Sequence, residues 1–135
     1  MIIIDKPPYK TIPNITEKHM YKSFIILELP YHVAFLTKQK DGNTLWLNWF
    51  GRDIRYGEEG SIWGWRANTN LITFLIRCWS RWETNEYNGD NIIKIYVCEN
   101  INEVYSIIND LSRKLTDTFR EIIVANAEEV FHDNH

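Results

Sequence analysis

Runs of apolar, β-branched and aromatic residues alternate with short polar turns through the first two thirds of the chain. Residues 23–29 (SFIILEL) form a nearly unbroken apolar run that is closed by Pro30, and this pattern predicts a strand buried on both faces. Two further runs, 31–38 and 44–50, are separated by a turn that contains Asp-Gly. Because both residues tolerate the positive φ of a type I′ turn, these two runs are predicted to pair as a hairpin.

Turn signals also divide the middle of the chain. The glycine-bracketed turn 57–60 is predicted to join 53–56 to 61–66 in a second hairpin. Residues 70–82 leave two interpretations open: their apolar positions fit a helical stripe, whereas their β-branched and aromatic content suits a strand that pairs back onto 61–66. We favour the strand. Residues 92–98 (IIKIYVC) predict another strand.

Two capping patterns indicate helices. Asn14 stands three residues before a glutamate, which suits a short helix through about Tyr21. Asn100 and Glu103 form a second capping pair, and the apolar residues after it recur at helical spacing. Whether this C-terminal helix breaks near 116–117 is left open.

Together these elements predict an α+β fold, in which an antiparallel meander of about five or six strands packs against a C-terminal helix or helical pair. The chain has 135 residues, and no linker, repeat or low-complexity tract divides it. A typical domain has about 150 residues. We therefore expect a single domain that spans residues 1–135.

Charge and hydropathy exclude several classes of partner. The chain carries 15 Lys and Arg against 18 Asp and Glu, a net charge of −3, whereas general polyanion binders have a basic excess. Nucleic acid is therefore not the expected partner. The N-terminal residues lack the pattern of a secretory signal, and the most apolar window, 71–79, is far shorter than the about 20 residues that span a bilayer. We expect no membrane partner and a cytoplasmic location.

No pattern of residues indicates catalysis, a metal or a cofactor. The four histidines are scattered, and both cysteines lie inside apolar runs, where a structural thiol is the usual occupant. Nucleophile, phosphate-loop and dinucleotide motifs are missing from the sequence. Asp53 with Glu58 or Glu59 would offer paired carboxylates for a small hydrolase, but adjacent acids at a hairpin tip are usually solvated. We expect no enzyme, no catalytic residue, no metal ligand and no cofactor.

Aromatic and acidic residues are the distinctive features that remain. Both faces of 44–50 (TLWLNWF) carry aromatic residues, so the six tryptophans of the chain do not all fit one core. Some of them are therefore candidates for an exposed patch of the kind found at interface centres. Acidic loops beside such a patch would steer a basic partner. The predicted partner-binding residues are Glu58, Glu59, Trp63, Trp65, Trp82, Glu83, Glu86 and Asp90.

In size, mild acidity and Lys/Asn/Ile-rich composition, the whole chain resembles the small immunity proteins of bacterial polymorphic-toxin and contact-dependent growth-inhibition systems. The resemblance implies a protein partner, a basic toxin domain of the nuclease type, whose active site or substrate-binding surface the chain would cover. It implies a monomer or weak dimer. Two alternatives stay open: a ligand- or carbohydrate-binding module with Trp46, Trp63 and Trp65 as its aromatic platform, and a phage-type inhibitor of a host enzyme.

Overall fold

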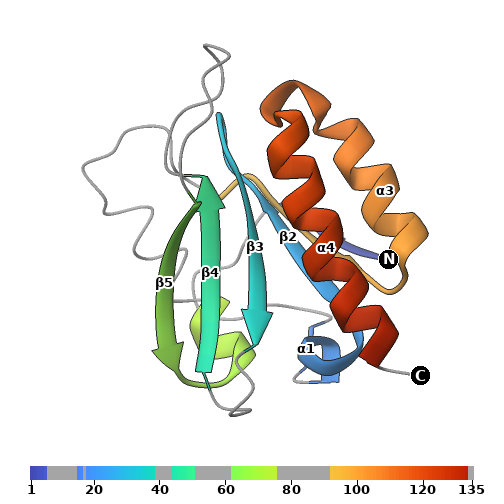
Figure 1. The fold of residues 1–135 in the computed structure, drawn as a ribbon. Helices are drawn as coiled ribbons and strands as arrows, with labels where there is room; N and C mark the ends of the chain where they lie inside the picture. Colours follow the sequence, from blue (N-terminus) through green and yellow to red (C-terminus); the bar gives the residue numbers. More distant parts are fainter. Residues whose placement is uncertain (6–14, 17, 39–43, 51–61, 76–91, 134–135) are drawn as a thin grey trace.

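A computed structural model describes most of the chain and shows an antiparallel sheet with two long helices across one face (Figure 1). The residues that the structure describes are 1–5, 15–16, 18–38, 44–50, 62–75 and 92–133.

The six strands are β1 (Ile2–Ile4), β2 (Phe24–Glu28), β3 (Val33–Lys38), β4 (Thr44–Phe50), β5 (Ile62–Asn68) and β6 (Lys94–Cys98). The helices are α1 (Lys18–Lys22), α3 (Ile101–Asp110), the 3₁₀ helix η2 (Ser112–Lys114), α4 (Asp117–Asp133) and a helical segment at 71–75. All strand pairs are antiparallel, in the order β1-β6-β2-β3-β4-β5. The predicted α+β fold, an antiparallel sheet packed against a C-terminal helical pair, is confirmed. The meander order holds for β2 to β5 only, because β6 lies between β1 and β2.

Strands β2 to β5 follow one another across the sheet. The β3–β4 register, from Lys38 opposite Leu45 to Ala34 opposite Trp49, agrees with the predicted hairpin, whose turn lies outside the described residues. The predicted strand at 61–66 corresponds to β5, which pairs with β4. Its predicted hairpin partner, 53–56, is also outside the described residues.

Two elements near the N-terminus differ from the sequence prediction or refine it. Strand β1 was not predicted, because three apolar residues are too few to show a period, yet it pairs with β6 from Ile2 opposite Val97 to Ile4 opposite Ile95. The predicted short helix is present as α1, and Asn14, its predicted cap, is not among the described residues.

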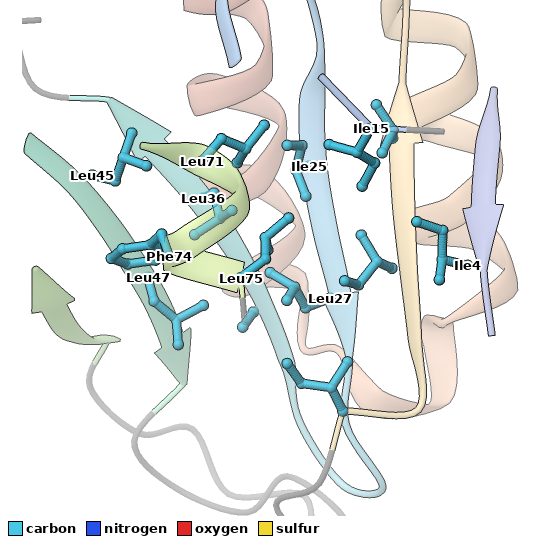
Figure 2. Close-up of a cluster of buried hydrophobic side chains, with 14 of the residues drawn as sticks. Ile4, Ile15, Ile25, Leu27, Leu36, Leu45, Leu47, Leu71, Phe74 and Leu75 are labelled. Atoms are coloured by element: carbon cyan, nitrogen blue, oxygen red, sulfur yellow. The ribbon is translucent and has the colours of Figure 1, made fainter. Parts of the chain in front are cut away.

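The preference for a strand at 70–82 is wrong for the part of it that the structure describes, because 71–75 is helical. The Asn70 Oδ1 accepts a hydrogen bond from the Thr73 N–H at 2.8 Å, which caps this turn. Leu71, Phe74 and Leu75 share one helical face and are buried against the sheet (Figure 2). A helical spacing that buries all three side chains on one face therefore outweighs their strand propensity.

Both faces of the sheet carry a hydrophobic core. On one face, Ile25 and Leu27 of β2 belong to the cluster that the 71–75 segment covers (Figure 2). On the other, Phe24 and Ile26 belong to a cluster that includes Phe119 of α4. Strand β2 is thus buried on both sides, as its nearly unbroken apolar sequence predicts.

The C-terminal helices are separated by a capped turn. At the start of α3, the Asn100 Oδ1 accepts from the Glu103 N–H and the Glu103 Oε1 accepts from the Glu99 N–H, both at 3.0 Å, so the predicted capping pair is confirmed. At the start of α4, the Thr116 Oγ1 accepts from the Phe119 N–H at 3.3 Å. The possible break near 116–117 is therefore real, and the C-terminal element is a helical pair.

Candidate functional site

Most of the predicted partner-binding residues are not described by the structure. Trp63 and Trp65 lie in β5, where the backbone register sets them opposite Trp49 and Leu47. The predicted acidic rim beside these tryptophans therefore stays a prediction. The predicted residues outside the described ranges are Glu58, Glu59, Trp82, Glu83, Glu86 and Asp90.

The indole of Trp46 is used in packing within the sheet. This side chain is half-buried, and its Cε3 and Cζ3 lie so close to Gly64 that a Cβ atom there would come within 2.7 Å of both. Beside it, the Asn48 amide donates to the Thr37 Oγ1 at 3.0 Å and to the Phe35 carbonyl at 3.3 Å. Gly64 thus lets the large ring of one strand lie directly on the backbone of the next.

A groove between α3 and α4 is the candidate site that the sequence analysis missed. The two helices lie side by side on the sheet, with the first half of α3 beside the second half of α4 (Figure 1). The hollow between them has a volume of about 600 Å³. Tyr105 is 47% exposed there, and Ile101 and Phe131 are half-buried beside it. We call this hollow the helical groove; its lining is Ile101, Tyr105, Ala125, Glu128, Glu129, Phe131 and His132.

The segment that forms the helical groove is strongly acidic. Residues 99–133 contain eight Asp or Glu and three Lys or Arg. Glu121, Glu128 and Glu129 are exposed and make no ion pair within the part of the chain that the structure describes. The apolar groove therefore has anionic side chains at its rim.

Two of the three cations in this segment bind groups of the protein itself. The Lys114 Nζ makes an ion pair with the Glu28 carboxylate and donates to the Leu29 carbonyl at 2.9 Å. The Arg120 guanidinium donates to the Ser112 carbonyl at 3.3 Å and lies 3.7 Å from an oxygen of Asp117. These two cations are held by internal partners, so the exposed charge of the helical layer is predominantly negative.

Glu28 is the centre of a polar network between the sheet and η2. Its Oε1 accepts from the Tyr96 hydroxyl at 2.8 Å, while its Oε2 contacts Lys114. Burial, and then the hydrogen bond to Glu28, raise the pKa of Tyr96 above its ordinary range. Both oxygens of the carboxylate have partners within the protein, so Glu28 links β2 to β6 and to η2. The sequence signal for it was a lone glutamate inside the apolar run 23–29.

Among the described residues, no three His, Cys, Asp or Glu side chains gather closely enough to hold a metal ion. No helix within those ranges has the length and apolar character needed to cross a membrane. Comparison of the chain with protein-family models, curated proteins and solved structures gave no match.

Cys98 is a buried free thiol at the end of β6, as its apolar sequence context predicts, whereas Cys78 lies outside the described residues. Burial is the main cause that raises the pKa of the Cys98 thiol to about 12. Its sulfur lies 3.9 Å from the Met1 sulfur, in the core rather than on the surface.

We expect Cys98 to resist thiol reagents in the folded protein at a pH of about 9, where an unfolded chain with a thiol pKa of about 8.5 reacts readily. Folding raises the pKa of the Cys98 thiol. The stability contributed by burying the neutral thiol is therefore complete below the pKa of the unfolded chain and is lost as the pH rises toward about 12. The measurement is the labelling rate of a Cys78→Ser variant with and without denaturant. Rapid labelling of the folded protein would contradict the burial of this thiol.

Proposed function

We propose that this chain is an inhibitor of the immunity-protein kind, which binds a basic protein partner through the helical groove. The observation that carries the proposal is the arrangement of charge in the helical layer. Lys114 and Arg120 bind internal groups, while the rim acids Glu128 and Glu129 are exposed. An acidic surface of this kind attracts a cationic partner and raises its association rate.

The groove also offers apolar contact area at its centre. Tyr105 and Phe131 supply aromatic surface, and Ile101 supplies aliphatic surface. Interfaces commonly have such a core, enriched in aromatic residues, with polar groups at the rim. An apolar side chain of the partner would enter the groove, and Lys or Arg residues around it would face Glu128 and Glu129.

A nuclease-type toxin suits this surface because its substrate-binding surface is basic. Lys and Arg side chains that contact nucleic acid phosphates provide most of the affinity for the substrate. A partner that pairs those cations with carboxylates and covers the surrounding surface would exclude the substrate. Inhibition by occlusion requires no catalytic group in the inhibitor.

The first experiment is to inspect the reading frames next to the gene for a toxin domain. A toxin domain found there is co-expressed with the chain, and binding is measured on the purified pair. We expect growth rescue and a complex whose association rate falls as salt is added. Glu128→Lys with Glu129→Lys is expected to weaken binding by about tenfold, since each reversal replaces an attraction to a facing cation with a repulsion.

A matched variant controls for the overall change in charge. Asp5→Lys with Asp110→Lys alters the net charge equally at exposed positions outside the groove, and should leave affinity nearly unchanged. Glu58→Lys with Glu59→Lys tests the acidic turn predicted from the sequence. Affinity and salt dependence that are unaffected by reversal at 128 and 129 would overturn the role of the helical groove.

A further inference from the structure

The face of α4 that points away from the sheet carries a regular stripe of side chains. Glu121, Ala125, Glu128 and His132 recur every three or four residues, and all four are exposed. Residues at this spacing lie on one face of a helix. The buried residues of α4 lie on the opposite face and belong to the core against the sheet. We call these four residues the outer stripe; all but Glu121 line the helical groove.

The negative charge along the outer stripe excludes several occupants of the groove. Glu121, Glu128 and the neighbouring Glu129 make no ion pair within the described ranges. A second copy of the chain would bring its own carboxylates against these three, and an acidic peptide or a nucleic acid strand would be repelled in the same way. Charge complementarity therefore favours a cationic segment of a protein partner.

Ala125 lies between the two levels of negative charge at 121 and 128. Its methyl group is the smallest side chain of the outer stripe, and it lines the helical groove. In the same lining, Tyr105 of α3 is 47% exposed and offers an apolar ring with a hydroxyl at its tip. Packed helices have axes about 8–10 Å apart, and small side chains at the contact permit the closer approach. Ala125 thus leaves room for a further helix along the groove.

The spacing of the carboxylates fits a helical partner segment better than an extended one. Glu121 and Glu128 are seven residues apart, which corresponds to about 10.5 Å along the axis of α4. Side chains at i and i+7 of a second helix lie on one face at the same spacing of about 10.5 Å. Side chains on one face of a strand are about 6.7 or 13 Å apart, so a strand that matches one carboxylate misses the other.

We propose, as a consequence of the function proposed above, that the helical groove receives a single amphipathic helix of the partner. This helix lies along α4, with a Lys or Arg at position i facing Glu121 and another at i+7 facing Glu128. Apolar residues at i+3 and i+4 contact Ala125 and Tyr105. Complexes in which a helix enters a groove commonly use anchor residues at these positions.

The test uses synthetic peptides of about 20 residues, because shorter isolated helices are marginal in water. The matched peptide is rich in alanine and glutamine, and it has two lysines seven residues apart with two adjacent leucines midway between them. A register control has the same composition with the lysines five residues apart, which places them on different faces of the helix. A helix-breaking control keeps the matched order but has two of its alanines replaced by proline.

We expect the matched peptide to cause saturable shifts of the Tyr105 and Ala125 amide signals in NMR spectra of the full chain. Both control peptides should bind about tenfold more weakly, since each loses either the second ion pair and its alignment or the helix itself.

Substitutions in the chain test the two positions that the proposal depends on. Ala125→Gln fills the space with a residue that suits a helix and should weaken the matched peptide about tenfold. Ser106→Gln, at an exposed position of α3 outside the groove lining, should leave binding unchanged. Glu121→Gln should weaken the matched peptide about threefold, as expected for one exposed ion pair, whereas Asp110→Asn should not.

The outcomes separate this inference from the function on which it rests. Equal binding of the matched peptide and either control, unchanged binding to the Ala125→Gln variant, or no saturable shift at low salt would overturn the helical segment. The proposed function is judged by charge reversal at 128 and 129 with the intact partner. Loss of the intact partner on that reversal, together with control peptides that bind as well as the matched one, would retain the function and reject the helix.

Discussion

Replacing Phe119 by alanine is expected to lower the free energy of unfolding by about 4 kcal/mol. Phe119 is 2% exposed and belongs to the core between the sheet and the helical pair. Its truncation removes apolar contact and leaves a cavity that the neighbouring side chains fill only in part. Chemical denaturation followed by circular dichroism measures the change.

Tyr105→Ala is the control, because Tyr105 lies on the exposed side of the same helical layer. We expect this variant to lose less than about 1 kcal/mol of stability. If the helical groove binds a partner, the two substitutions have the opposite ranking in a binding measurement. Tyr105→Ala should lose affinity, whereas Phe119→Ala should retain most of its affinity under conditions in which it is folded. A Phe119→Ala variant as stable as the wild type would show that α4 is not packed on the sheet as described.

Replacing Glu28 by alanine should lower the free energy of unfolding by about 3 kcal/mol, since removing one partner of a largely buried pair leaves the other charge without compensation. The side chains of Glu28 and Lys114 are 15% and 23% exposed. The Tyr96 hydroxyl loses its acceptor at the same time. The measurement is the midpoint and slope of urea denaturation near neutral pH.

Two further variants separate charge from hydrogen bonding in this network. Glu28→Gln keeps an oxygen to accept from Tyr96 but removes the charge, so the pKa of Tyr96 should fall toward its ordinary range, as followed by phenolate absorbance. Glu28→Leu combined with Lys114→Met removes both charges and should recover part of the lost stability. Strict additivity of the single changes at 28 and 114 would contradict the coupling.

Elements were predicted correctly where the apolar pattern or capping residues within the segment itself match the way the element packs in the fold. The apolar run 23–29 is buried on both sides of the sheet, and the Asn100–Glu103 pair caps α3. The segment 71–75 was predicted wrongly because its composition suits a strand, whereas the burial of one helical face depends on the sheet beneath it. Strand β1 depends on its pairing with a strand that is distant in sequence, which no local pattern records.

The candidate site was harder to predict than the fold. The sequence predicted an acidic rim beside Trp63 and Trp65, whereas the groove that the structure shows lies between α3 and α4. A signal for it was present, since the C-terminal segment has an excess of acids and Tyr105 falls outside the apolar stripe of α3. The sequence could not show which cations are held internally. The contact of Lys114 with Glu28 joins residues that are far apart in the chain and forms only when the helices pack on the sheet.

The contact of Trp46 with Gly64 also limits how this fold can change through evolution. A Cβ atom at position 64 and an indole at position 46 cannot occupy the same space. Proteins that share this sheet should therefore acquire a side chain at 64 only together with a smaller residue at 46. Covariation of these two positions would mark descent of the β4–β5 pair even where the surrounding sequence has diverged beyond recognition.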